Sequence, residues 1–321
     1  MIFKQILILF LFICIQSSFS SSIIDIAFTV KNLSTNQRLQ LNFFTLITSL
    51  FQHTSKDNLR LHVIGDSDSH YFVNQTLQNF HYNHQINKFN IDDLASKYEK
   101  LISPLIKHFS SGHTYYKDPL FFLSPFLHQI LPENISRVIM LDIDLRFDND
   151  IQELYKLFDQ FNQSQILGIA RENQPIYRHL LWLYRQENPH TNIGNPPPYG
   201  ITGFNSGVLL LNLNKIRQSS LFNNYLKNSY LIEQLIHKYH FNHSHLGDQD
   251  FYTLLSFEHN DLFFILPCSW NRQLCTWWKG KGYDDVWDNY FNCNNEQNIS
   301  LYHGNCNTPM PNRIINEKLE L

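Results

Sequence analysis

The chain has 321 residues, of which 43% are hydrophobic and 17% are charged. This composition excludes a mostly disordered chain, which needs few hydrophobic and many charged residues. The net charge of −3 argues against a protein that binds a nucleic-acid backbone, because such a protein carries a basic surplus. The length suits one large domain or two small ones.

The first 22 residues are predicted to be a targeting segment. The apolar run Ile6–Ile15 follows Lys4 and, as a helix, would cover about 15 Å, half of a bilayer core. The small residues of Ser17–Ser22 suit a cleavage site, so we expect a signal peptide, with an uncleaved signal-anchor as the alternative. Residues 23–321 are then expected to form one domain that faces the secretory lumen.

Strands and helices are predicted to alternate in the first half of the chain. Apolar and β-branched runs predict strands at Ile23–Val30, Leu59–Ile64 and Arg137–Leu141. Helical spacing of apolar residues predicts helices at Asn36–His53, Ala95–His108 and Pro119–Leu131, with a further helix–strand pair within Ser69–Asn90. Pro104 and Pro125 are expected to kink or end the second and third of these helices. Repeated β-α units imply an α/β fold with a mostly parallel sheet and helices on both faces.

Two acidic residues, Asp142 and Asp144, follow the predicted strand Arg137–Leu141. Ligands of such sheets bind beyond the carboxyl ends of the strands. Alternate residues of an extended chain share a face, so both carboxylates can approach one divalent cation, for which Mn²⁺ or Mg²⁺ is expected. A solvated loop is the alternative interpretation, and a phosphatase with an aspartate nucleophile is another, in which Asp284 and Asp285 would supply the metal pair.

Two further motifs combine glycine with polar residues. Gly203–Gly207 (GFNSG) precedes the apolar run Val208–Leu213 and is predicted to be a turn whose backbone lies close to a ligand. His245–Asp250 (HLGDQD) precedes the apolar helical stretch Phe251–Phe257, where Asp248 could be the N-cap. The carboxamide of Gln249 can donate to and accept from sugar hydroxyl groups, which an N-cap alone does not explain.

The last fifth of the chain is rich in cysteine and tryptophan. Six Asn-x-Ser/Thr sequons and the targeting segment indicate an oxidising compartment, so the four cysteines are predicted to form two disulfides, with three possible pairings. Trp277 and Trp278 offer flat faces for sugars, although core packing is the alternative. His303, followed by Gly304, is the best candidate for a third metal ligand. The sequons begin at Asn32, Asn74, Asn134, Asn162, Asn242 and Asn298, and the cysteines are Cys268, Cys275, Cys293 and Cys306.

A strand that ends in Asp-x-Asp, a Phe-Asn-Ser-Gly-Val turn, Gly-Asp-Gln-Asp and a late His-Gly together resemble the retaining glycosyltransferases of family 8. The resemblance covers about Ile24 to Pro311. Strings such as PPPYGITGFNSGVLLLNL and WNRQLCTWWKGKGYDDV resemble the branch that adds xylose in α-1,3 linkage to the xylose of xylosyl-glucose glycans on EGF-like repeats, such as those of Notch, in the endoplasmic reticulum.

The resemblance implies a GT-A type nucleotide-sugar fold, UDP-xylose as donor and Mn²⁺ as cofactor. It implies that Asp142, Asp144 and His303 hold the metal. It further implies residue roles for donor and acceptor binding: Phe28, Thr29, Val30 and Ile143 at the nucleotide, Asn205, Ser206, Asp248 and Gln249 around the donor sugar, and Trp278 and Asn305 at the acceptor glycan. The implied disulfides are Cys268–Cys293 and Cys275–Cys306.

Two departures from the family pattern concern the diphosphate. Many members have an arginine on the helix before Asp-x-Asp, whereas Tyr115–Phe122 holds only Lys117. Many also end in His-x-x-Gly-x-x-Lys-Pro, whereas here Gly304 directly follows His303 and Thr308, not a lysine, stands immediately before Pro309. We therefore expect diphosphate contacts from elsewhere. The alternatives kept open are a family 8 transferase that uses UDP-glucose or UDP-galactose, and a catalytically inactive glycan-binding protein.

The expected mechanism follows from the residue at the donor sugar. Double displacement needs a carboxylate nucleophile, and Gln249 is a poor one. Same-face displacement is therefore expected, with the departing phosphate oxygen taking the proton of the acceptor and Gln249 stabilising the developing cation. Asp248 is the alternative catalytic carboxylate.

Overall fold

The computed structural model describes residues 23–82, 85–110, 115–242, 246–293 and 298–311. The predicted targeting segment at residues 1–22 and His245 therefore lie outside the described residues. Within the described ranges, no helix combines the length and the apolar character that a membrane span needs.

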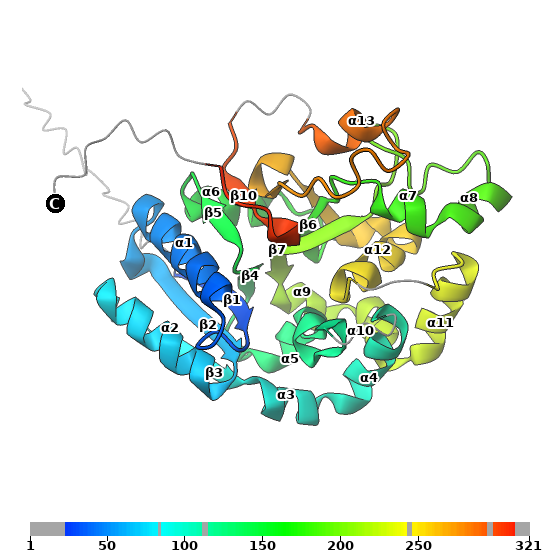
Figure 1. Ribbon diagram of the computed structural model, residues 1–321. Coiled ribbons are helices and arrows are strands. Elements are labelled where there is room, and N and C mark those ends of the chain that lie inside the picture. Colours follow the sequence, from blue (N-terminus) through cyan, green and yellow to red (C-terminus); the bar gives the residue numbers. More distant parts are fainter. Residues whose placement is uncertain (1–22, 83–84, 111–114, 243–245, 294–297, 312–321) are drawn as a thin grey trace, which may run out of the picture.

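A seven-stranded sheet forms the centre of the fold (Figure 1). Its strand order is β3-β2-β1-β4-β7-β6-β8. Only β7 runs antiparallel to its neighbours, and the other pairs are parallel. This confirms the predicted α/β fold with a mostly parallel sheet. The strands are β1 (Ile24–Val30), β2 (Leu59–Gly65), β3 (Ile86–Asn90), β4 (Arg137–Leu141), β6 (Leu167–Arg171), β7 (Phe204–Asn212) and β8 (Phe263–Leu266).

Helices cover both faces of this sheet, because its strands alternate apolar side chains between two cores. In β1, Phe28 belongs to the core under α1 (Gln37–His53), α2 (Ser67–Asn79) and α6 (Ile151–Lys156), and Ala27 belongs to the opposite core. That second core packs under α3 (Ile91–Lys97), α4 (Glu99–Phe109), α5 (Leu127–Ile130), α9 (Leu213–Gln218), α10 (Ser220–Lys227), α11 (Ser229–Lys238) and α12 (Asp248–Glu258). The shorter helices α7 (Ile176–Leu180), α8 (Trp182–Glu187) and α13 (Trp287–Phe291) lie towards the upper right of Figure 1.

A second, three-stranded sheet joins the end of the chain to the segment after β4. Its strands are β5 (Leu145–Phe147), β9 (Arg272–Gln273) and β10 (Leu301–His303), in the order β5-β10-β9. The antiparallel register of β10 and β5 pairs His303 with Leu145. The N–H of Gly304 donates to the carbonyl oxygen of Asp144 at 2.8 Å. This small sheet thus carries the late His-Gly motif to the acidic motif.

Two predicted helices differ from the structure. The predicted helix Pro119–Leu131 is two 3₁₀ turns, Pro119–Phe122 and Ser124–Phe126, followed by α5. Pro119 and Pro125 lack the N–H that an α-helix interior needs, so each lies in the first two residues of a short turn instead. The predicted helix Ala95–His108 is the pair α3 and α4, which Tyr98 separates. The side chain of Asn90 caps α3 by accepting from two backbone N–H groups, so the helical region begins earlier than predicted.

The predicted turn at Gly203–Gly207 is also wrong, because most of it belongs to β7. Phe204 already pairs with Arg171 of β6, and Asn205 pairs with Ala170. The next pairing is Ile169 with Leu209, so three residues of β7, numbers 206–208, form a bulge. A bulge redirects side chains at the end of a strand. Here it lies at the carboxyl ends of β4 and β6.

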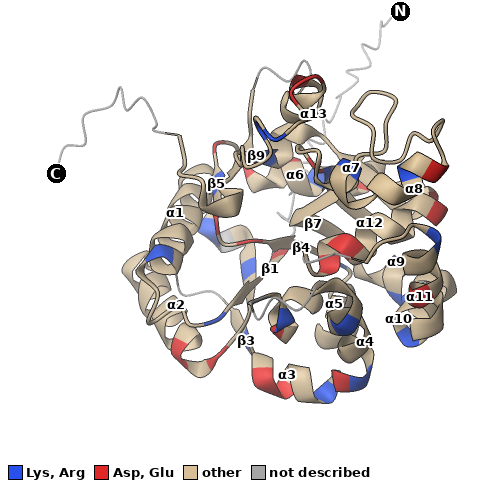
Figure 2. Ribbon diagram, turned by 45° about the vertical axis from the view of Figure 1, so that its right-hand side comes forward, with Lys and Arg blue, Asp and Glu red and all other residues tan. Residues whose placement is uncertain are grey.

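The two disulfides are Cys268–Cys293 and Cys275–Cys306, which confirms the pairing expected from the family resemblance. They tie the segment around β9 to the residues before and after β10. In Figure 2, basic and acidic positions are interspersed along outer helices such as α3 and α8.

Candidate active site

A cavity of about 690 Å³ lies at the carboxyl ends of the central strands. Its lining brings together residues from Thr29 to Asn307, and so unites motifs that are far apart in the sequence. Among its lining residues are Asp142, Asp144, Asn205, Ser206, Asp248, Gln249, Trp278, His303 and Asn305, all of which the sequence had indicated. The cavity is therefore the candidate active site.

Asp142, Asp144 and His303 form the cluster most suited to a metal. One ligand atom from each residue lies within 4.8 Å of the other two. The Nε2 atom of His303 is 3.3 Å from Asp144 Oδ1 and 3.6 Å from Asp142 Oδ2. Two carboxylates and one imidazole are a donor set that suits a divalent cation such as Mn²⁺. This cluster agrees with the predicted metal ligands.

The orientation of His303 is fixed from behind by Asn271. The Nδ1–H of His303 donates to Asn271 Oδ1 at 3.0 Å, and Asn271 Nδ2 donates to Asn205 Oδ1 at 2.9 Å. Because Nδ1 carries a hydrogen in this arrangement, Nε2 is the ring nitrogen that faces the two carboxylates, and it is the atom that would bind a metal after losing its own proton. Sequence analysis missed Asn271, since an asparagine 32 residues before the histidine has no local pattern.

The charges in the cluster influence each other strongly. Burial and the adjacent Asp144 carboxylate raise the pKa of Asp142 to about 7. Burial opposes ionisation of Asp144 as well, but the charge and hydrogen bond of His303 hold the pKa of Asp144 below its ordinary value. Burial likewise opposes protonation of His303, yet the two carboxylates raise its pKa. A divalent cation would relieve the repulsion between the carboxylates.

Asp248 and Gln249 lie at the start of α12, on another wall of the cavity. The N-cap of α12 is Gly247, with φ of 67°, so the structural alternative, in which Asp248 is the N-cap, is wrong. Asp248 instead accepts hydrogen bonds from the hydroxyl groups of Ser124 and Ser206. Burial raises the pKa of Asp248 to about 6, although these hydroxyl groups partly offset the effect.

Gln249 is 7% exposed and its carboxamide is held at both ends. Its Oε1 accepts from the backbone N–H of Ser206 at 3.3 Å, within the bulge of β7. Its Nε2 donates to Tyr177 Oη at 3.2 Å and lies 3.4 Å from Glu172 Oε2. The bulge and the start of α12 thus position this residue together.

Glu172 is a site residue that sequence analysis missed. It follows the carboxyl end of β6, lines the cavity and is 3% exposed. Burial raises the pKa of Glu172 to about 7, and the hydrogen bond from Asn205 only partly opposes this effect. The rule that directed attention to Asp142, namely ligand binding at the carboxyl ends of strands, applies equally to Glu172.

The residues predicted at the nucleotide are divided by the pleat of β1. Thr29 lines the cavity, whereas the side chains of Phe28 and Val30 are buried in the core, where Phe28 contacts Phe43. Ile143 packs against the same core. Thr29 can therefore contact a ligand with its side chain, whereas Phe28, Val30 and Ile143 can do so only with their backbone atoms.

The predicted acceptor residues lie on the wall formed by the disulfide-linked segment. Trp278 lines the cavity and its ring lies 4.7 Å from that of His179. Asn305 lines the cavity too, but its Oδ1 accepts from the backbone N–H groups of Leu274 and Cys275, so this oxygen is already occupied by the fold. Trp277 is 65% exposed at the rim.

Arg38 is the only lysine or arginine that lines the cavity in the described part of the chain. It lies in the first turn of α1, and its charge contributes to the low pKa of Asp144. Lys117 does not line the cavity, and neither do Asp284 and Asp285, which the phosphatase interpretation requires. The structure thus offers no second acidic pair at the metal cluster within the residues it describes.

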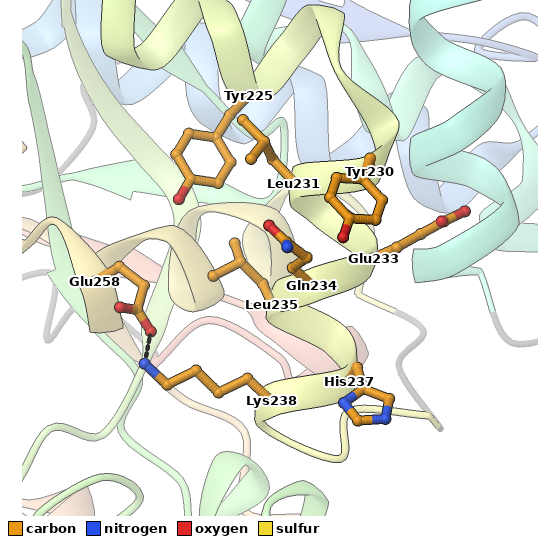
Figure 3. A pocket seen from close by; sticks show the side chains of 9 residues that line it. All are labelled: Tyr225, Tyr230, Leu231, Glu233, Gln234, Leu235, His237, Lys238 and Glu258. Carbon is orange, nitrogen blue, oxygen red and sulfur yellow. Dashed lines mark hydrogen bonds and ion pairs between the residues drawn. The ribbon is translucent and has the colours of Figure 1, made fainter.

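A second hollow, of about 730 Å³, lies along α11 (Figure 3). Tyr225, Tyr230 and the Lys238–Glu258 ion pair are among its lining residues. It shares no residue with the cavity that contains the acidic cluster. We therefore do not assign the candidate active site to it.

Comparisons with known proteins identify relatives of this chain. The family model described as glycosyl transferase family 8 matches residues 14–304. Xyloside xylosyltransferase 1 of Mus musculus is 52% identical over 219 residues, which are 68% of this chain and 55% of the mouse protein. The chain thus spans about half the length of this curated relative.

Solved structures extend the comparison to the fold. The crystal structure of mouse xyloside xylosyltransferase 1 in its apo form matches with a TM-score of 0.84 and 42% identity, and the match covers 90% of this chain and 99% of that chain. The galactosyltransferase LgtC, in complex with donor and acceptor sugar analogues, matches with a TM-score of 0.53 at 18% identity, covering 87% and 86% of the two chains. The fold is of the GT-A type.

Proposed function

This chain belongs to glycosyltransferase family 8, and we propose that it is a retaining transferase that moves xylose from UDP-xylose, in α-1,3 linkage, to the xylose of xylosyl-glucose glycans on EGF-like repeats. The observation that carries this proposal is the meeting of Asp142, Asp144 and His303 with Gln249 in one cavity. The similarity to mouse xyloside xylosyltransferase 1 supports the choice of xylose.

In the proposed enzyme, Asp142, Asp144 and His303 hold a divalent cation, for which Mn²⁺ is our choice because the set includes an imidazole. When bound, the cation neutralises the charge of the leaving diphosphate. Asn271 keeps Nε2 of His303 directed at the carboxylates. Arg38 places a positive charge at the same cavity. It is proposed to contact the diphosphate in place of the lysine and arginine that many family members have.

Gln249 is proposed to face the reacting carbon of the xylose. Its Oε1 carries a partial negative charge that stabilises the developing oxocarbenium ion, and it forms no covalent bond. Of the nearby carboxyl groups, Glu172 is largely desolvated and Asp248 is bound by two serine hydroxyl groups. Glu172 Oε2 also accepts from the side-chain amides of Asn205 and Gln249. Hydrogen bonds of this kind lower the nucleophilicity of a carboxylate oxygen, so we favour same-face displacement over a double displacement. The leaving phosphate oxygen then takes the proton of the acceptor hydroxyl.

The wall with Trp278 and Asn305 is the proposed acceptor side. Flat aromatic faces complement the C–H faces of sugars, and the rim position of Trp277 leaves room for the polypeptide that carries the glycan. The two disulfides that support this wall are consistent with folding in an oxidising compartment. We propose the lumen of the endoplasmic reticulum as the location.

The direct test is incubation of the protein with Mn²⁺, a panel of UDP-sugars and a xylosyl-glucose acceptor, with product masses as the readout. Gain of one pentose from UDP-xylose alone would support the proposal. Transfer of a hexose would mean that the donor is UDP-glucose or UDP-galactose and not UDP-xylose. Glycan binding without any transfer would indicate an inactive binding protein instead.

A further inference from the structure

Glu172 is a buried carboxyl group without an assigned role. It is 3% exposed, and its Oε1 makes no hydrogen bond in the described structure. Its Oε2 is the acceptor for two side-chain amides, Asn205 Nδ2 at 3.2 Å and Gln249 Nε2 at 3.4 Å. Burying a carboxyl group is costly. Within the described residues Glu172 forms no ion pair, although the charge of His303 favours its ionised form, so its position calls for an explanation.

The contacts of Gln249 depend on which end of its carboxamide faces which neighbour. Glu172 Oε2 already accepts from Asn205 Nδ2, and a proton on this carboxyl group would lie on Oε1, so Oε2 selects the NH₂ end of Gln249. The N–H of Ser206 only donates, so it selects the oxygen end. Tyr177 Oη is compatible with either end, because a hydroxyl group both donates and accepts. Glu172 and Ser206 thus decide the orientation.

We propose that Glu172 is a positioning residue that holds the Gln249 carboxamide with its oxygen towards the donor sugar. This inference deepens the proposed function and rests on it. A rotated carboxamide would place its NH₂ group where positive charge develops, and would oppose the reaction instead of assisting it. The role needs a strong acceptor at Glu172, and no covalent bond to the substrate.

A second chain of hydrogen bonds also ends at Glu172. It runs from His303 through Asn271 and Asn205 to the same Oε2. A substitution of Glu172 can therefore disturb the metal cluster as well as Gln249. The test has to separate these two effects, which a single variant cannot do.

A double-mutant cycle separates them. Glu172→Ala is expected to lower kcat about tenfold, the effect of one lost hydrogen bond, with the KM for UDP-xylose unchanged. In a Gln249→Ala background the same substitution should lower kcat by less than about twofold, because the group it positions is gone. A further tenfold loss in that background would overturn the proposal, since Glu172 would then act independently of Gln249.

Conservative variants keep the test decisive. Glu172→Gln retains an oxygen acceptor for both amides and places its NH₂ group at the unpaired Oε1 position, so most of the activity should remain. Glu172→Asp shortens the side chain by one methylene group and so moves the carboxylate away from Gln249. It takes the place of Glu172→Ala in the double-mutant cycle if the alanine variant does not fold. Glu133→Gln, at an exposed position, is the matched control.

A readout that needs no substrate distinguishes this inference from the proposed function. In protein labelled with ¹⁵N-glutamine, the carboxamide signals of Gln249 are those that vanish in Gln249→Ala. They should be protected from solvent exchange in the native protein and in Glu172→Gln, and should lose protection in Glu172→Ala. Unchanged protection in Glu172→Ala would refute the positioning role even if another sugar proves to be the donor.

Discussion

Gly207 and His303 are in direct contact, and the absence of a side chain at Gly207 makes this contact possible. A Cβ atom at Gly207 would lie 2.3 Å from Cε1 of His303 and 2.6 Å from Nδ1. The sequence suggested that this glycine admits a ligand, whereas in the structure it admits the imidazole that completes the metal cluster. The bulge of β7 therefore leaves the space into which β10 of the small sheet places the His303 side chain.

Gly207→Ala should displace the imidazole and weaken metal binding at least about tenfold, because packed cores do not absorb an added methyl group at such a distance. Free Mn²⁺ measured by electron paramagnetic resonance during titration checks this. Gly280→Ala is the control, because a Cβ atom there meets nothing within 4 Å. Its φ of 72° disfavours a side chain, so this variant shows the effect of backbone strain without a contact to the imidazole. Equal Mn²⁺ affinities in both variants would count against the contact described.

Asn271→Ala should weaken Mn²⁺ binding about tenfold, because the imidazole loses the acceptor that fixes its tautomer. The same titration measures the effect, and transfer activity should recover as Mn²⁺ is raised. The exposed Asn289→Ala is the control. An Asn271→Ala protein that binds Mn²⁺ normally would show that His303 needs no support from behind.

Gln249→Ala should lower kcat about a hundredfold and leave the KM for UDP-xylose nearly unchanged, because its oxygen interacts with charge that appears only in the transition state. Initial rates over a range of UDP-xylose concentrations separate the two constants. Gln234→Ala, on the exposed side of α11, is the control. A loss shared equally between kcat and KM would instead indicate simple donor binding.

The free energy of unfolding should respond to pH through Glu172. Its folded pKa is raised to about 7 from 4.5, so the folded state binds the proton more tightly than the unfolded state. The group therefore stabilises the fold least at high pH, and its contribution declines as pH rises from 4.5 to 7. Relative to the native protein, Glu172→Gln should gain up to about 3 kcal/mol over this interval.

Urea unfolding at pH 5 and pH 7.5, in the presence of a chelator, measures this difference. The exposed Glu133→Gln variant should show no such gain. A Glu172→Gln advantage that stays the same at both pH values would mean that the carboxyl group ionises as readily in the folded protein as in the unfolded protein, and that its pKa is not raised.

Loss of the Cys275–Cys306 disulfide should lower the free energy of unfolding by about 3 kcal/mol, because the bond closes a long loop in the unfolded chain. The double variant Cys275→Ser, Cys306→Ser tests this by denaturant titration. Transfer to the glycan acceptor should fall further than hydrolysis of UDP-xylose, since Asn305 and Trp278 share the supported wall. An equal fall in transfer and in hydrolysis would mean that the disulfide acts on the metal cluster and not on the acceptor wall.

The sequence by itself determined the order of strands and helices in the first half of the chain, because hydrophobic periodicity is a local property. It also indicated Asp142 and Asp144, since both follow one strongly apolar strand and lie two residues apart. The two helix prolines had different outcomes: Pro125 interrupts the predicted helix Pro119–Leu131, as expected, whereas Pro104 lies inside α4.

Only the tertiary structure decided which distant groups meet at the site. Glu172 reaches Gln249 across 77 residues, and Asn271 reaches His303 across 32. Such contacts depend on strand order, on the bulge in β7 and on the register of β10, and none of these leaves a periodic signal in the residues concerned. Hydrogen bonds between distant side chains are set by packing, so the orientation of the metal ligands and of the carboxamide could be read only from the fold.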